Sequence, residues 1–408
     1  MHIKDAKSKY SKSDQSFLRD FNTKKLLNIL RERGPMSRVE LAEVSNLDKK
    51  TVTNIVNDMF ANNQVRVLAT ESTGLGRPKE ILSLNGEFSR CIGIDLGGTH
   101  ITGVIIDFTG NILASHSIDI HNNVETDILI QLCDLIISQL LKKAELSIDD
   151  ISEIGVAFQG HIDVETGEAI LSENVPNWNS VMFRTALKEK YKKEILMDDC
   201  SRLMTLAELW HGEGRYSDNF IVFDLGLGIG CGMVINGQIY AGSKGKSGEV
   251  GHTIVKVDGP ECTCGRRGCI ESLASGWALS KQAKMLAEKY PNGLLAEVTK
   301  NAYETPSTKD IVLAAELGDK ECYDLLVNAG KCIAIGIANS ISLINPSKVI
   351  IGGRLIKDNN ILLESIIENV KLQTIPELYK DSIITTSKLG STASAIGAAT
   401  LCLKKHYE

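Results

Sequence analysis

These 408 residues lack the sequence features of membrane, secreted and low-complexity proteins. No uninterrupted apolar run approaches the roughly 18 residues that a membrane-spanning helix needs. The polar first residues, MHIKDAKSKYSKSDQSF, contain no apolar segment of a secretory signal, and no biased repeat occurs. These absences predict a bacterial cytoplasmic protein, associated with the nucleoid when it binds DNA. The length predicts two or three domains.

A disulfide framework is also missing, although the chain has ten cysteines. Three of them crowd into the eight residues 262–269. The others are scattered, mostly among apolar neighbours, as is typical of reduced and buried thiols. These scattered cysteines are Cys91, Cys133, Cys200, Cys231, Cys322, Cys332 and Cys402.

Charge is unevenly distributed along the chain. Residues 1–88 contain 15 Lys and Arg against 11 Asp and Glu, whereas the remainder contains 30 against 40. A basic head on an acidic body indicates that the two parts have different partners.

Residues 24–61 have the pattern of three short helices. In the second, Ser37 and Glu40 have the spacing of a capping box. After a three-residue break at 45–47, Asp48 is expected to cap the third helix. The polar residues of the first helix that are expected to face water are Asn28, Arg31 and Glu32.

Two short helices joined by a tight break are the layout of a helix-turn-helix, in which the later helix lies in the DNA major groove. Residues 65–85 alternate as two strands around a glycine-rich tip, which predicts a wing suited to a narrow minor groove. The alternative is a protein-docking module with solvated lysines. The predicted DNA contacts are Ser37, Arg38, Lys49, Lys50, Thr51, Thr53, Asn54, Arg77 and Lys79.

The body contains two strand–turn–strand units with glycine-rich turns, at residues 91–115 and 220–242. Such turns let backbone amides approach a phosphate, and an aspartate beside them can hold magnesium through water. Two related units predict a duplicated α/β lobe with a cleft between the copies. A plain tight hairpin is the alternative for each turn. The predicted phosphate or nucleotide contacts are Asp95, Gly97, Gly98, Thr99, Gly226 and Gly228.

Two adjacent carboxylates, Asp198 and Asp199, stand between a strand and a helix. A carboxylate there can serve as a general base toward a sugar hydroxyl. An aspartate at a helix start is also an ordinary N-cap, and the residues alone favour the cap.

One imidazole and three thiols follow one another with the spacing of a metal site: His252, Cys262, Cys264 and Cys269. A Cys₃His set matches tetrahedral zinc, and four protein ligands leave no open position for hydrolysis. We therefore predict one structural Zn²⁺ per chain, with redox thiols as the alternative.

The runs GEVGHTIV, CTCGRRGCIES, DLGGTH and NVPNW closely resemble the ROK family of repressors, open reading frames and sugar kinases. The head resembles the repressor branch, typified by the xylose and N-acetylglucosamine repressors. The resemblance implies an α/β fold, a winged helix-turn-helix followed by an actin-like, ribonuclease-H-like two-lobed body whose cleft binds a sugar. It implies as sugar contacts Asn174, Asp198, Asp199, Glu249, His252 and Glu271.

The resemblance also predicts the domain limits. We expect a flexible basic leader at 1–20, a winged helix-turn-helix at 21–88, lobe 1 at 89–197 completed by helix 390–408, and lobe 2 at 198–389 with the zinc loop.

Two departures from the family pattern bear on function. Asp198 replaces an asparagine, and Leu227 replaces the threonine of a Gly-Thr-Gly turn that kinases of the family use for phosphate. The implied function is a sugar-responsive repressor, not an enzyme, that binds operator DNA as a dimer or tetramer. The alternative is an ATP-dependent sugar kinase with a DNA-binding head, which Asp95, Thr99 and Asp199 favour.

Overall fold

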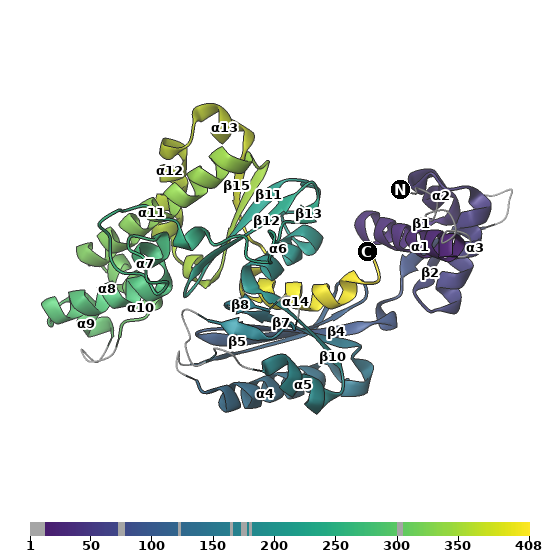
Figure 1. Ribbon diagram of the computed structural model, residues 1–408, viewed down its shortest axis with the longest axis horizontal. Coiled ribbons are helices and arrows are strands. Elements are labelled where there is room, and N and C mark those ends of the chain that lie inside the picture. Colours follow the sequence, from purple (N-terminus) through teal and green to yellow (C-terminus); the bar gives the residue numbers. More distant parts are fainter. Residues whose placement is uncertain are drawn as a thin grey trace, which may run out of the picture.

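A head and two α/β lobes make up the molecule (Figure 1). The computed structural model describes residues 13–71, 78–120, 124–163, 166–172, 178, 182–299 and 305–408. The mixed α/β body with two five-stranded sheets confirms the predicted fold class. The limits of the predicted domains stay a prediction. Two predicted site residues lie outside the described ranges, Arg77 and Asn174.

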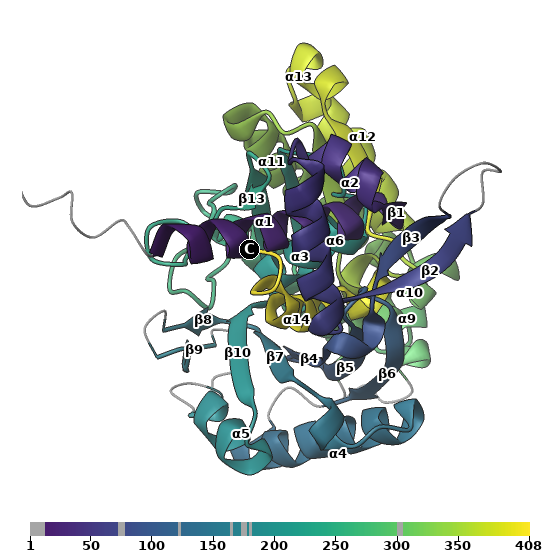
Figure 2. The same cartoon turned by 90° about the vertical axis from the view of Figure 1, so that its right-hand side faces the viewer.

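Three helices and a three-stranded sheet form the head. Its elements are α1 (Ser13–Arg33), β1 (Met36–Ser37), α2 (Arg38–Ser45), α3 (Lys49–Ala61), β2 (Val65–Glu71) and β3 (Lys79–Leu84). The sheet order is β1-β3-β2, and Figure 2 shows α3 along the face of the head that turns toward the viewer. Both predicted caps are present: Ser37 and Glu40 form the capping box of α2, and Asp48 accepts from the Thr51 amide at 2.9 Å.

Part of the expected flexible leader, residues 1–20, is helical, because α1 already begins at Ser13. No proline or glycine interrupts the chain between Ser13 and Arg33, so nothing ends the helix early. Arg19 also binds α3, since its Nε donates to Asp58 at 2.7 Å.

Lobe 1 has a sheet of order β10-β7-β4-β5-β6. Helices α4 and α5 cover one face of this sheet, and α14 covers the other (Figure 1). Because both faces are covered, nearly every residue of β4 and β7 is buried. The elements are β4 (Arg90–Gly97), β5 (His100–Asp107), β6 (Ile112–Asp119), α4 (Thr126–Ala144), β7 (Glu153–Phe158), β8 (His161–Ile162), β9 (Ala169–Leu171), α5 (Phe183–Tyr191) and β10 (Glu194–Asp199).

Lobe 2 has a sheet of order β13-β12-β11-β14-β15. In both lobes an antiparallel hairpin leads into parallel neighbours, so the predicted duplication is visible in the strand pairing. The strands are β11 (Phe220–Leu225), β12 (Ile229–Ile235), β13 (Gln238–Ile239), β14 (Lys348–Gly352) and β15 (Ile383–Thr386). The helices are α7 (Ile270–Ala274), α8 (Gly276–Lys289), α9 (Leu294–Val298), α10 (Thr308–Glu316), α11 (Lys320–Ile344), α12 (Asn360–Gln373) and α13 (Pro376–Asp381).

Among the described residues, α11 alone is long and apolar enough to cross a membrane by length and composition. The core helices of globular proteins pass the same test, so a single such helix is weak evidence for a span. Ile333 and Ile337 of α11 lie in the hydrophobic core of lobe 2, beside Phe223 of its sheet.

Helices α6 (Cys200–His211) and α14 (Ala393–Lys404) pack closely against each other and against the sheet of lobe 1. At three glycines a Cβ atom would collide with a helix backbone. It would lie 1.9 Å from the Ala395 carbonyl at Gly93, 1.9 Å from the Ala398 carbonyl at Gly155, and 1.7 Å from the Leu203 carbonyl at Gly397. Only glycine therefore fits at these three positions.

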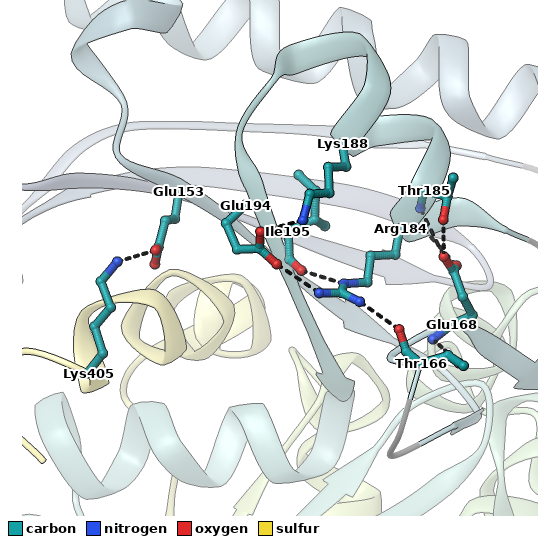
Figure 3. A network of polar contacts seen from close by, with 9 residues as sticks. All are labelled: Glu153, Thr166, Glu168, Arg184, Thr185, Lys188, Glu194, Ile195 and Lys405. Atoms are coloured by element: carbon teal, nitrogen blue, oxygen red, sulfur yellow. Dashed lines mark hydrogen bonds and ion pairs between the residues drawn. The ribbon is translucent and has the colours of Figure 1, made fainter.

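Polar contacts fasten the outer elements of lobe 1 (Figure 3). Glu168 accepts from the Arg184 amide at 3.1 Å, at the start of α5. The Arg184 guanidinium pairs with Glu194 of β10 at 2.8 Å. Lys405, just after α14, pairs with Glu153 of β7. The C-terminal helix is thus held to lobe 1 by an ion pair as well as by its apolar face.

The first helix of the head binds the C-terminus of the body. Asn28 donates to the Tyr407 carbonyl, and the Arg31 guanidinium lies 4.0 Å from the centroid of the Trp210 ring. The expectation that Asn28 and Arg31 face water was wrong, because the body covers this side of α1. Burial lowers the pKa of Arg31. The guanidinium lies over the Trp210 ring, where a cation–π contact stabilises its charge.

The last residues of the chain join the head, lobe 1 and α6. The Tyr407 ring stacks on the Phe108 ring, with 5.0 Å between the ring centroids. It packs edge-to-face with the Trp210 ring, with 5.3 Å between the centroids. Its hydroxyl donates to the Phe108 carbonyl at 2.7 Å. The His406 ring packs edge-to-face with Phe88, in the segment between head and body, with 5.2 Å between the ring centroids. Burial lowers the pKa of His406 to about 4, so its ring is uncharged at neutral pH.

Replacing Gly397 with alanine tests the close packing of α6 and α14. The added methyl group would overlap the Leu203 carbonyl, so we expect the free energy of unfolding to fall by about 3 kcal/mol. Gly226→Ala is the matched control, because the nearest atom to its Cβ would be 3.9 Å away. Urea unfolding of both variants measures the effect, and equal stabilities would contradict the packing described here.

Candidate functional site

A cleft of about 1060 Å³, including its open mouth, lies between the lobes. The glycine turns β4–β5 and β11–β12 and the first residues of α6 and α14 meet there. Ten predicted site residues line it: Asp95, Gly97, Gly98, Thr99, Asp199, Gly226, Gly228, Glu249, His252 and Glu271. The structure thus brings together residues that are up to 176 positions apart in the sequence, from 95 to 271.

Three carboxylates lie at the base of the cleft. Burial raises the pKa of Asp224 to about 7, and the neighbouring carboxylates of Asp95 and Asp199 act in the same direction. Burial also raises the pKa of Asp199 to about 6. Sequence reasoning missed Asp224, although its Asp-Leu-Gly environment repeats that of Asp95.

Asp199 has the N-cap role that the residues alone favoured. Its Oδ1 accepts from the amides of Ser201 and Arg202, each at 3.0 Å, at the start of α6. The same side chain lines the cleft, so capping fixes its position toward a ligand. With a raised pKa, this carboxyl can take up or release a proton near neutral pH.

Asp198 is not brought into the cleft with the other predicted sugar contacts. Its Oδ1 accepts from Arg202 Nε at 3.0 Å and from Nη2 at 2.5 Å. Arg202 is buried, with 7% of its surface exposed, so the pair compensates a charge that burial would otherwise penalise. The sequence carried a signal for this pair, since the two residues are four positions apart on the strand–helix junction.

The four predicted metal ligands converge beside the cleft. Their ligand atoms all lie within 4.8 Å of one another, and the set is His252, Cys262, Cys264 and Cys269. His252 Nδ1 lies 3.6 Å from Cys262 Sγ, and the sulfurs of Cys264 and Cys269 are 3.8 Å apart. The soft donor set, the short separations and the burial of three of the four residues fit a bound metal ion.

A tight backbone loop holds the metal-binding residues. The Cys262 amide donates to the Arg266 carbonyl at 2.8 Å, and the Gly265 amide donates to the Cys262 carbonyl at 2.9 Å. Gly268 has a φ of 74°, and a Cβ there would lie 1.6 Å from the Lys256 carbonyl. The glycines of the motif therefore allow the chain to wrap closely around the sulfurs.

The metal loop and the cleft share side chains. Glu271, which follows the last cysteine by two residues, accepts from the Ile229 amide at 2.9 Å and from the Thr263 hydroxyl at 3.4 Å. His252 turns Nδ1 toward the cysteines and Nε2 toward Glu249, 3.9 Å away. A change in the metal loop therefore moves groups that line the cleft.

Two side chains that sequence reasoning missed occupy the first glycine turn. Gln159 Oε1 accepts from the Gly98 amide at 3.0 Å. His100 Nε2 lies 3.1 Å from Asp95 Oδ2, and its Nδ1 lies 3.4 Å from Thr99 Oγ1. Nothing in the spacing of the sequence connects residue 159 with residue 98, because the contact arises only when β7 pairs with β4.

The second glycine turn reaches across to lobe 1. Leu227 packs against the hydrophobic core of lobe 1, where a hydroxyl side chain would gain no such contact. Arg354, which follows Gly352 and Gly353 at the end of β14, binds Asp119 of lobe 1 at 3.1 Å. These two contacts link the lobes on either side of the cleft.

The predicted DNA contacts fall into two groups. On α3, Lys49, Lys50, Thr53 and Asn54 are exposed. The others are engaged within the head: Ser37 is a buried cap, Thr51 bonds to Asp48, Arg38 pairs with Glu80, and Lys79 pairs with Glu40. Of the predicted DNA contacts within the described residues, those on the first turns of α3 are the exposed ones.

Comparisons with known proteins agree with this architecture. The chain is 28% identical to the xylose repressor of Bacillus subtilis (strain 168), over 96% of this chain and 97% of that protein. It is 29% identical to the glucokinase of Thermotoga maritima, over 76% of this chain and 96% of the kinase. The solved structure of a ROK family transcriptional regulator, a homologue of the Escherichia coli MLC protein, matches with a TM-score of 0.77 and 24% identity. The match covers 96% of this chain and 97% of that one.

A model of one protein family matches most of the body. It covers residues 91–405, from the first strand of lobe 1 to the C-terminal helix. The chain belongs to the ROK family.

Proposed function

We propose that this protein is a sugar-responsive transcriptional repressor of carbohydrate-utilisation genes. The observation that carries the proposal is the joining of a helix-turn-helix head to a carboxylate-lined cleft in one chain. A xylose repressor matches 96% of this chain, head included, whereas a glucokinase matches only 76%. The repressor reading accounts for both parts of the molecule.

The head is proposed to bind operator DNA through α3. Lys49 and Lys50 neutralise phosphates, and Thr53 and Asn54 reach base edges in the major groove. The β2–β3 hairpin serves as the wing. In a homodimer two such heads would contact half-sites about one helical turn apart, so the operator would be a palindrome.

The cleft is proposed to bind the inducing sugar. Asp199, Glu249 and Glu271 accept hydrogen bonds from sugar hydroxyls, and His252 contributes its Nε2. Asn174 completes the set that the family resemblance implies. A structural Zn²⁺ on the His252 and cysteine ligands would fix the loop that carries Glu271, because Thr263 of that loop donates to this carboxylate.

Helices α6 and α14 are proposed to connect the cleft with the head. The start of α6, with Cys200 and Ser201, lines the cleft, and its end carries Trp210 beneath the head. The start of α14, with Ser394, also lines the cleft, and the chain that follows it reaches Tyr407. A sugar that draws the lobes together would move both helix starts and thereby the surface on which α1 rests. The sugar must bind the DNA-incompetent arrangement more tightly, and a hundredfold difference corresponds to about 2.7 kcal/mol.

A sugar kinase is the second candidate, because Asp199 lines the cleft with a raised pKa as a general base would. Leu227 argues against it, since an apolar side chain stands where phosphate-binding relatives have a hydroxyl. Incubation with hexoses and Mg²⁺–ATP separates the two candidates: fast ADP release that Asp199→Asn abolishes would favour the kinase.

Operator release tests the proposed function. Duplexes selected from a random library on the full-length protein are titrated at fixed salt against a panel of monosaccharides and oligosaccharides. We expect at least one sugar to weaken DNA binding tenfold or more. Glu271→Gln should reduce this effect at least tenfold, because it removes a charge that binds sugar hydroxyls. Glu261→Gln, on the same loop but exposed and outside the cleft, is the matched control. A chain that selects no DNA, or that no sugar releases, would contradict the proposal.

Metal content tests the zinc site. The purified protein should contain about one zinc per chain by mass spectrometry, and Cys262→Ser should lose it. We expect this variant to unfold at a lower temperature and to bind the releasing sugar at least tenfold more weakly, since the loop holds Glu271. Cys332→Ser, outside the cluster, is the control and should behave like the wild type. A wild-type protein without stoichiometric zinc would rule the site out.

A further inference from the structure

We propose that Gln159 and His100 fill the first glycine turn in place of a nucleotide phosphate and its cation, so that the cleft takes its sugar without a nucleotide. This inference rests on the proposed function, because it explains how a kinase-like cleft serves as a sensor. It assigns a specificity role to two side chains that were not among the predicted site residues.

Gln159 accepts the hydrogen bond that the Gly98 amide of the turn could otherwise donate to a phosphate. Its side-chain oxygen accepts from the Gly98 amide at 3.0 Å. A carboxamide oxygen is an acceptor, as a phosphate oxygen is, so the amide is already satisfied. The residue is held in place by its own backbone, since its carbonyl accepts from the Ser172 hydroxyl at 2.8 Å. A phosphate could reach this amide only after displacing Gln159.

His100 contacts both polar side chains of the turn, Asp95 and Thr99. Its Nε2 lies 3.1 Å from Asp95 Oδ2 and its Nδ1 lies 3.4 Å from Thr99 Oγ1. Because an ionised carboxylate can only accept, Nε2 donates to Asp95, and Nδ1 is within hydrogen-bond distance of the Thr99 hydroxyl. The imidazole N–H thus satisfies the carboxylate that a magnesium ion would otherwise need.

The backbone of the turn is shaped around this ring. A Cβ at Gly97 would lie 2.3 Å from the His100 ring, so glycine here makes room for the imidazole. Asp95 is only 6% exposed, and the His100 ring lies against its carboxylate. Together, Gln159 and His100 engage three of the four residues of this turn that were predicted to bind phosphate or metal: Gly98, Asp95 and Thr99.

Lobe 2 closes the same side of the cleft. Leu227 packs against the lobe 1 core, and Arg354 binds Asp119 at 3.1 Å. These two contacts hold lobe 2 against lobe 1 beside the first glycine turn. Glu249 and Glu271, the proposed sugar contacts, line the cleft beside the metal loop and not in this turn.

Binding of Mg²⁺–AMPPNP, measured by calorimetry on the full-length protein, tests the inference. The comparison is between Leu227→Thr alone and the triple variant Gln159→Ala, His100→Ala, Leu227→Thr. We expect the triple variant to bind the nucleotide at least tenfold more tightly, because only it frees the turn. Equal affinities of the two variants, or equally tight binding by the wild type, would overturn the inference. In the triple variant, Gln159→Glu in place of Gln159→Ala keeps an acceptor for the Gly98 amide. We expect this change to cancel part of the gain in nucleotide affinity.

A second measurement needs no variant that must fold. In the wild-type protein without ligand, the Gly98 amide should be protected from hydrogen exchange, because Gln159 holds it. Rapid exchange at Gly98 would overturn the inference. Neither experiment uses DNA or a sugar, so a failure of the proposed repressor function and a failure of this inference are observed separately.

Discussion

The close packing of α14 against α6 and the lobe 1 sheet is the constraint on which the rest of the molecule depends. Gly93, Gly155 and Gly397 leave no room for a side chain, so the backbones touch directly. Closely packed elements move together rather than deform. Since both helices begin at the cleft and lead to the ring of Tyr407 beneath the head, a displacement at one end is carried to the other.

The cleft itself is built from two halves with different chemistry. On the side of the metal loop, Glu271 and Glu249 line the cleft, and the Thr263 hydroxyl joins Glu271 to the loop of cysteine ligands. On the opposite side, Gln159 and His100 satisfy the glycine turn from within. In the proposed function the cleft serves recognition, and these two side chains are our explanation of how it does so without a nucleotide.

The sequence predicted the elements whose signal is local. The caps at Ser37 and Asp48, the repeated glycine turns and the converging cysteines are all encoded within a few residues of one another. What it could not predict are contacts between distant segments. Arg31 was expected in water because Trp210, which covers it, is 179 positions away in the chain. Gln159 gave no signal, since its role exists only after β7 pairs with β4. Asp198 and Arg202 are an exception among the contacts that sequence analysis missed. They are four residues apart, so their ion pair could have been predicted from the sequence.

Thermodynamic linkage gives the most direct test of the coupling between cleft and head. If a sugar weakens operator binding by a given factor, the operator must weaken sugar binding by the same factor. The affinity of the releasing sugar should be measured by calorimetry on the free protein and on the protein saturated with operator. We expect the two affinities for the sugar to differ by the same factor by which the sugar weakens operator binding. Equal affinities would mean that cleft and head do not communicate.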